Sequence, residues 1–297
     1  MLSKRAWMLG LLLPWLVGCS SLRLTYGQGP TLAYWWLDGH VDFSSEQAPR
    51  AKAALDEWFS WHRATQLGDY AALLATAQRL AVDNITPAQV CRFNQSVELR
   101  LMRAFEPAVA PAAAIVRSLS LAQIRHLDQR YLKGNAEWQG DHLQATPADR
   151  HAAAMKRWID RAESFYGPLD EAQRRLVSAG MQPPLYDPQR WLDERRARQQ
   201  DILRTLRQLH ADRADQASTE AALRAMALHM VQSPRADFRA AKERADAAQC
   251  ALIAQLHNTT TTVQRQRAVK QFKSWEDDVR ALAAPVKGST PLSPGEG

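Results

Sequence analysis

The chain has 297 residues and a formal net charge of +7, which becomes +5 once Lys4 and Arg5 are removed with the N-terminal segment described next. Because this excess is mild and spread along the chain, it does not predict a nucleic-acid partner. Glycine is scarce (13 residues), whereas alanine, leucine, glutamine and arginine are abundant, and this composition favours helices.

The first residues have the order of a secretory signal. Lys4 and Arg5 supply a positive end, and residues 6–17 form an apolar run of only about a dozen residues. A membrane-spanning helix needs roughly 20 apolar residues. We therefore predict a cleaved signal peptide over residues 1–18 rather than a transmembrane anchor.

The apolar run ends in Leu16-Val17-Gly18-Cys19. This tetrapeptide resembles the bacterial lipobox, whose cysteine is acylated and becomes the new N-terminus. The resemblance implies lipidation of Cys19, a lipidated linker over residues 19–30, and a membrane partner reached through the lipid anchor. Ser20-Ser21 follow without an aspartate, which by resemblance to lipoprotein sorting favours the outer membrane, with the domain facing the periplasm. An ordinary secreted protein with an incidental Cys19 is the alternative.

Apolar residues recur at helical spacing in successive segments of residues 31–284, and we find no convincing alternation with a period of two. These patterns predict an all-α fold, a multi-helix bundle with no sheet. Prolines, among them Pro107 and Pro111, are expected at helix ends or in first turns. A seam between two lobes is expected near residues 180–187, and a disordered tail over residues 285–297.

An aromatic cluster lies shortly after the expected anchor. Its members are Tyr34, Trp35, Trp36, Trp58, Phe59 and Trp61. We interpret it as core packing. Contact with the membrane interface, which aromatic rings favour, is a second interpretation.

One short pattern recurs: an apolar residue, then Ser, Thr or Asp, then two residues, then Gln. It pairs Thr86 with Gln89, Ser120 with Gln123, and Asp170 with Gln173, with a looser copy at Thr261 and Gln264. The pattern is that of a capping box preceded by a hydrophobic staple, so each copy predicts a helix start. Taken singly, each copy is fully explained as a good helix start.

The three strict copies resemble the LTxxQ repeats of periplasmic stress chaperones of the Spy and CpxP type. Those chaperones are small helical proteins that hold unfolded clients on a concave face. The resemblance covers the motif positions alone, and this chain departs from it by being far longer and lipidated.

A broader similarity is to a family of proteobacterial lipoproteins of unknown function. The segments that carry it are Leu16 to Ser21, Tyr34 to Asp38, Tyr166 to Asp170 with Gln173 to Arg175, and Cys250 with Leu256 to Thr260. This similarity runs over most of the chain but implies no activity.

The remaining cysteines predict a disulfide. With Cys19 taken by lipid, Cys91 and Cys250 form an even pair in an oxidising compartment. Each lies beside the apolar stripe of its helix, so a bridge could staple distant helices. Two free buried thiols are the alternative.

A basic stretch includes Arg190, Arg195, Arg196, Arg198, Arg204 and Arg207. We interpret it as a solvated helix face balanced by Asp193, Glu194 and Asp201. A groove for acidic clients is the alternative.

No pattern indicates a reaction. The eight histidines are scattered without ligand spacing, and there is no His-Glu-x-x-His, phosphate loop or nucleophile elbow. We therefore predict no catalytic residues, no metal and no cofactor. The expected function is a non-catalytic binding domain, chaperone-like or related to envelope stress, with unfolded or envelope proteins as partners. The alternative is a structural lipoprotein that docks on one specific envelope partner.

Overall fold

The computed structural model describes residues 21–181 and 187–284. Within these residues it contains twelve α-helices and no strand, which confirms the predicted all-α, multi-helix fold. In chain order the helices are α1 (Ser21–Gly27), α2 (Gly29–Val41), α3 (Gln47–Thr65), α4 (Leu67–Leu80), α5 (Pro87–Val116), α6 (Leu121–His142), α7 (Pro147–Tyr166), α8 (Glu171–Gly180), α9 (Pro188–Ala211), α10 (Gln216–Val231), α11 (Ala236–Asn258) and α12 (Thr262–Ala283). The signal peptide, Cys19, the tail and most of the expected seam near 180–187 lie outside the described residues.

Helical structure begins earlier than predicted. Helices α1 and α2 occupy much of residues 19–30, which the sequence analysis treats as a linker. The segment packs on the domain because Arg23 Nε donates a hydrogen bond to Asp278 on α12 at 2.7 Å, and the Tyr26 hydroxyl lies 2.8 Å from Nδ1 of His62 on α3. Any linker between Cys19 and the domain is therefore shorter than expected.

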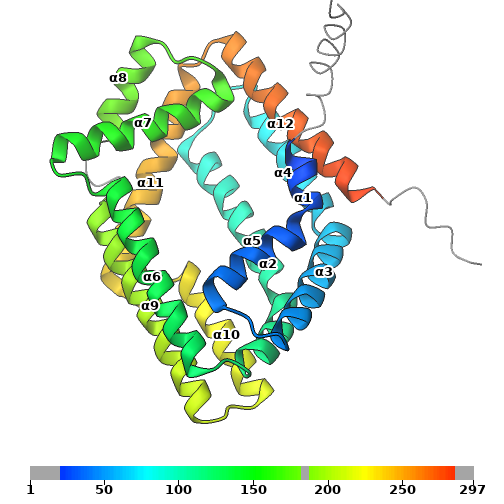
Figure 1. Ribbon diagram of the computed structural model, residues 1–297. Coiled ribbons are helices and arrows are strands. Elements are labelled where there is room, and N and C mark those ends of the chain that lie inside the picture. The colour runs from blue at the N-terminus through cyan, green and yellow to red at the C-terminus, as the bar shows by residue number, and fades with distance from the viewer. Residues whose placement is uncertain (1–20, 182–186, 285–297) are drawn as a thin grey trace, which may run out of the picture.

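The central element is α5, the longest helix with 30 residues, which packs against α3, α4, α10 and α11. Figure 1 shows α6 and α9 side by side at the left, and α4 beside α12 at the upper right. Helix α12 also packs against α7 and α1, so the last helix of the described residues contacts the first.

Pro107 and Pro111 lie inside α5 rather than at helix ends, so the expectation is wrong for these two, whereas Pro188 does begin α9. A proline in a helix interior removes a backbone hydrogen bond and costs about 3 kcal/mol. Tertiary packing outweighs that cost here, because Val109 and Ala113 on the same stretch are completely buried.

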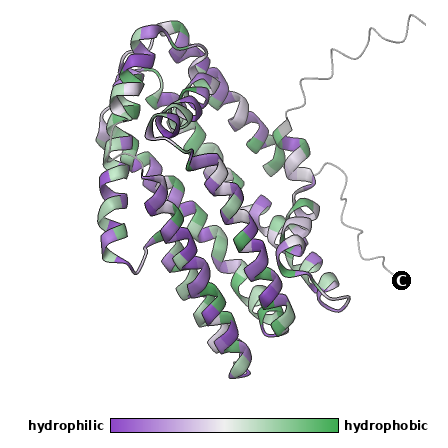
Figure 2. Ribbon diagram, turned by 60° about the vertical axis from the view of Figure 1, so that its left-hand side comes forward, coloured by the Kyte–Doolittle hydropathy of each residue, from purple (hydrophilic) through white to green (hydrophobic). Residues whose placement is uncertain are grey.

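Within the described residues, four small clusters of buried apolar side chains can be distinguished, and others such as Val109 and Ala113 are buried outside them. The clusters centre on Val177 and Ile159 of α8 and α7, on Leu203 of α9, on Ala71 of α4, and on Cys250 of α11. Figure 2 shows hydrophobic and hydrophilic residues mixed along nearly every helix. In the described part of the chain, no helix has the length and apolar character needed to cross a membrane. Hydrogen bonds between helices and one disulfide therefore add to what the small apolar clusters contribute to the fold.

Candidate binding pocket

The recurring pattern does form capping boxes. At Thr86, Ser120, Asp170 and Thr261 the side chain accepts the backbone N–H of a glutamine three residues on, and that glutamine's side chain accepts the cap's own N–H. A further copy escaped the sequence analysis although Phe43-Ser44-Ser45-Glu46-Gln47 fits the pattern. There Ser44 N–H donates to Gln47 Oε1 at 3.0 Å, and Gln47 N–H donates to Ser44 Oγ at 3.3 Å.

Two pairs of these boxes lock together through their glutamines. Gln173 and Gln264 exchange two Nε2-to-Oε1 hydrogen bonds, both of 2.9 Å. Gln47 and Gln123 do the same at 3.3 and 2.6 Å. Each pair thereby joins the starts of two helices that are distant in the sequence, α8 with α12 and α3 with α6.

Each paired glutamine also donates to the carbonyl two residues before its partner's cap. Gln173 donates to Thr259 O at 3.2 Å, and Gln264 donates to Pro168 O at 3.0 Å. All four hydrogen-bonding positions of each of these two amides are consequently filled. The paired boxes therefore hold distant helices together, in addition to starting helices as predicted.

The Thr86 box has a different partner. Its glutamine, Gln89, bonds within its own box. The preceding residue, Ile85, instead donates to Asn258 Oδ1 at 2.9 Å and accepts from Asn258 Nδ2 at 3.0 Å. This clamp holds the start of α5 against the end of α11.

The predicted disulfide joins the same two helices. Cys91 on α5 and Cys250 on α11 are bonded, with their Cα atoms 5.6 Å apart. Such a separation is ordinary for a disulfide. The bridge and the Ile85–Asn258 clamp together fix α5 against α11 along one wall of a pocket.

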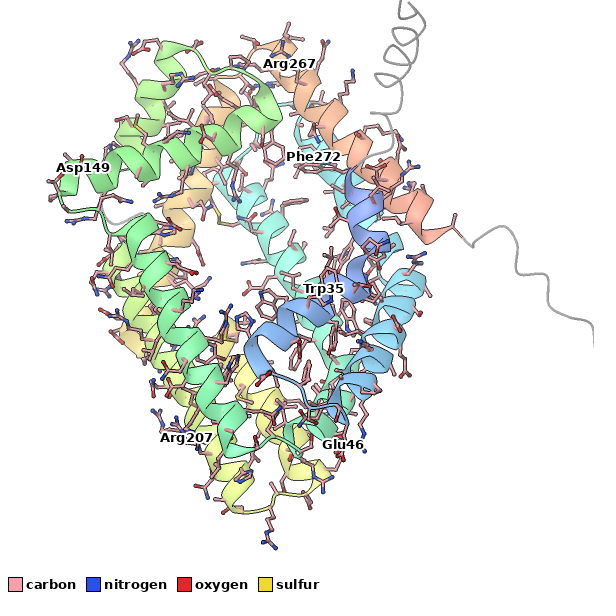
Figure 3. The ribbon with its side chains drawn as sticks, viewed as in Figure 1. Trp35, Glu46, Asp149, Arg207, Arg267 and Phe272 are labelled. Atoms are coloured by element: carbon pink, nitrogen blue, oxygen red, sulfur yellow. A yellow bond between two sulfur atoms is a disulfide. The ribbon has the colours of Figure 1, made fainter. Side chains whose placement is uncertain are left out.

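This pocket is an apolar cavity of about 250 Å³ among α4, α5, α7, α11 and α12. Its aromatic lining residues are Phe93, Trp158, Phe165, Tyr166 and Phe272. The rings are packed on one another, with the Phe165 and Phe272 centroids 5.3 Å apart, and Phe272 points from α12 toward α7 in Figure 3. The volume exceeds the roughly 150 Å³ of an engineered cavity that takes up benzene.

One of the residues that line the pocket is a buried histidine, His257 of α11. The sequence did not distinguish it from the other scattered histidines. His257 Nε2 lies 2.9 Å from Asp83 O, and Nδ1 lies 2.9 Å from the Tyr166 hydroxyl. Because a carbonyl only accepts, Nε2 carries the proton and Nδ1 accepts from Tyr166. Burial lowers the pKa of His257 and raises the pKa of Tyr166 to about 12, so both are neutral near pH 7. His257 and Tyr166 therefore present no charge to an apolar occupant, and the charged residue among those that line the pocket is the exposed Arg161.

A protein-family model matches residues 39–230, more than half of the chain, and is described as a family of unknown function (DUF6279). The chain belongs to this family. No curated protein matches it, and no solved structure matches it.

The matched region contributes only part of the pocket in this DUF6279 protein. Phe93, Trp158 and Phe165 lie inside it, whereas His257 and Phe272 lie beyond it. Among the described residues, no group of three His, Cys, Asp or Glu side chains is placed to hold a metal ion.

The aromatic cluster of the family member divides in two. Trp58 is half-buried and donates from Nε1 to Ala104 O at 2.8 Å, in agreement with core packing. Core packing is wrong for Trp35 and Trp36, which are 65% and 64% exposed on α2 (Figure 3 labels Trp35). They are exposed because no other helix among residues 21–181 and 187–284 covers the face of α2 that carries them.

The basic stretch is balanced by acids of its own helix, as interpreted for Glu194 and Asp201, and it also contacts α6. Three of its arginines contact acids of α9 or its N-cap, and the other three contact α6 across the α6–α9 seam. Their partners are Asp187 for Arg190, Asn135 for Arg195, Gln139 for Arg196, Glu194 for Arg198, Asp201 for Arg204 and Asp128 for Arg207. The alternative of a groove for acidic clients at this stretch receives no support from this arrangement.

Glu194 is the buried centre of that network. It accepts from Arg198 Nε at 2.6 Å and from Arg235 Nε at 2.6 Å, and is only 4% exposed. Burial alone would raise the pKa of the Glu194 carboxyl, but hydrogen bonds from Arg235, Ser233 and Arg198 outweigh it and hold the pKa below its usual value. The carboxylate is therefore charged at neutral pH and ties α9 to the start of α11.

Glu194→Gln is expected to lower the free energy of unfolding by about 2 kcal/mol at pH 7, because the negative partner of Arg198 and Arg235 is lost and the amide nitrogen cannot accept as the carboxylate oxygen does. The folded-state pKa is depressed, so the wild-type advantage is present above the usual carboxyl pKa of 4.5 and is lost as the pH falls through the lower folded value. Urea unfolding from pH 7 to pH 3 measures this difference. Glu171→Gln, at an exposed carboxylate on α8, is the control; equal losses in both variants would contradict the assignment.

Proposed function

We propose that this protein is a lipid-anchored, non-catalytic binding protein of the bacterial cell envelope with a chaperone-like role. Its pocket would hold a large apolar side chain of an unfolded or partly folded envelope protein. The observation that carries the proposal is the open, aromatic-lined cavity beside the disulfide. Pockets of this kind, apolar with a few polar groups at the mouth, are the usual form of a binding site.

The pocket is tested by closing its mouth. Gln249 is exposed and lines the pocket on α11, so Gln249→Trp is expected to cover the opening without disturbing the core. Binding of the neutral apolar dye Nile red should weaken by about tenfold, equivalent to roughly 1.4 kcal/mol. Protection of a reduced, denatured model protein against aggregation, measured by light scattering, should fall with it.

Gln255→Trp is the matched control, because Gln255 is exposed on the same helix but does not line the pocket. It should bind Nile red and protect the client as the parent protein does. Unchanged protection by Gln249→Trp, with dye binding lost, would remove the pocket from the proposed function.

The anchor is tested at Cys19. Cys19→Ala is expected to move the protein from the membrane fraction to the soluble periplasmic fraction, because acyl chains contribute about 0.8 kcal/mol for each buried methylene. Fractionation followed by immunoblotting measures the change. A variant that stays as firmly membrane-bound as the parent would contradict lipid anchoring.

A second candidate function, docking on one specific envelope partner, is favoured by the exposed face of α2. Leu32, Trp35 and Trp36 are 43%, 65% and 64% exposed, and their spacing places them on one side of the helix. Exposed apolar residues that gather in one place often mark protein–protein contacts. Crosslinking in whole envelopes separates the two candidates: many unrelated clients favour the chaperone-like role, and one stoichiometric partner favours docking.

A further inference from the structure

A second cavity adjoins the apolar pocket. It has a volume of about 380 Å³, lies between α4 and α5, and shares Leu80 and Phe93 with the pocket. Its walls are more polar, with contributions from Thr76, Gln89, Arg92, Ser96 and Arg100. We call this second cavity the arginine groove. No carboxylate lines either cavity among the described residues.

The arginines of the groove are poorly paired. Within the described part of the chain, the exposed Arg92 side chain makes no hydrogen bond or ion pair. Arg100 donates to Ser96 O at 3.0 Å, but its buried Nε has no hydrogen-bond partner there, and the nearest carboxylate, Asp69, is 3.9 Å away. The Arg100 side chain is 23% exposed, so an anionic group that enters the groove can contact its guanidinium and add to the long pairing with Asp69.

We propose that the pocket and the arginine groove together bind a peptide segment in which a large apolar side chain is followed or preceded by carboxylates. This inference rests on the proposed function and names its client class. The apolar side chain occupies the pocket, and the carboxylates lie against Arg92 and Arg100. Opposite charge across the groove is what selects this occupant.

The spacing of the groove sets the spacing in the peptide. Phe93, at the boundary with the pocket, and Arg100 are seven residues apart on α5. At a rise of about 1.5 Å per residue this is roughly 10 Å, the span of about three extended residues. Carboxylates two to four residues from the apolar side chain therefore fit best.

A peptide suits the walls better than a hydrocarbon chain. Asn94 and Gln249 present exposed amides beside the pocket, and Gln89 and Ser96 line the groove. These groups can bond with a peptide backbone, whereas a lipid chain would cover them without replacing their hydrogen bonds to water.

The test uses three fluorescein-labelled peptides that carry one tryptophan and differ only three and four residues after it, where they have two Glu, two Gln or two Lys. Binding to the full-length protein is measured by fluorescence anisotropy. The Glu peptide should bind more tightly than the Gln peptide by about two- to fivefold for each ion pair, and the Lys peptide should bind most weakly. The preference should shrink in 0.5 M salt, because salt screens exposed charges.

The variant Arg92→Gln/Arg100→Gln should remove the preference while Nile red binding stays unchanged. Arg125→Gln, at an exposed arginine on α6 outside both cavities, is the control and should keep the preference. If the three peptides bound equally and Gln249→Trp still abolished their binding, selection by charge would be overturned. The proposed function would not be affected by that result. Absence of both peptide and Nile red binding would overturn both. If the protein bound palmitate in a manner that depends on Arg92 and Arg100 and bound none of the peptides, the proposal of a peptide ligand would be overturned and the site would be assigned to a lipid.

Discussion

Replacement of Cys91 and Cys250 together by alanine should lower the free energy of unfolding by about 4–5 kcal/mol. The two residues are 159 positions apart. In the chain-entropy model, a bridge that closes so long a loop reduces the conformational entropy of the unfolded chain, which raises its free energy by about 5 kcal/mol. Urea unfolding, followed by circular dichroism, measures the loss. Strain and residual structure in the unfolded state reduce this figure, so it is the upper end of the expected range.

The wild-type protein in dithiothreitol is the natural comparison. It should unfold at nearly the urea concentration of the double alanine variant, and dithiothreitol should leave that variant unaffected. A loss below about 1 kcal/mol would show that the bridge contributes little and that the small apolar clusters suffice. The bridge also holds the wall of the pocket, since Phe93 and Ile253 flank it on α5 and α11. Nile red binding by the folded double variant should therefore be weaker than in the parent.

The helices and their starts were predictable because their signals are local. Apolar spacing and a cap three residues before a glutamine are visible in the sequence, as at Thr86, Ser120 and Asp170. The Cys91–Cys250 pair was predictable by counting cysteines. The copy at Ser44 was equally visible and was missed.

The pairing of the boxes and the pocket could not be predicted in the same way. Gln173 and Gln264 are 91 residues apart, and no local pattern indicates which helix starts meet. The box itself uses only the side-chain oxygen of its glutamine and leaves the two amide N–H groups free. If that glutamine is buried, these groups need an acceptor elsewhere in the protein, but the sequence does not identify it. Phe93, Phe165 and Phe272 lie in stripes predicted as core, and whether such stripes close completely or leave a cavity depends on distances between helices.

The paired boxes give the second large expected effect. Gln173→Ala should lower the free energy of unfolding by about 3–4 kcal/mol, far more than the roughly 1 kcal/mol of a lost helix cap. The reason is that Gln173 is only 2% exposed, and its removal takes partners from the buried Gln264 amide, from the Asp170 N–H and from Thr259 O. Each such group costs about 1–3 kcal/mol. Urea unfolding at pH 7 measures the loss.

Gln89→Ala is the matched control, because Gln89 stands in the same position of a capping box but bonds within its own box. It should cost about 1 kcal/mol or less. A double-mutant cycle of Gln173→Ala with Gln264→Ala isolates the bond between the boxes. Since each single variant already breaks the reciprocal amide pair, the double variant should be less destabilised than the sum, with a coupling of about 1–3 kcal/mol. Equal costs at Gln173 and Gln89, together with additive losses in the cycle, would mean that each box acts alone as a helix start and that the pairing of α8 with α12 contributes nothing to stability.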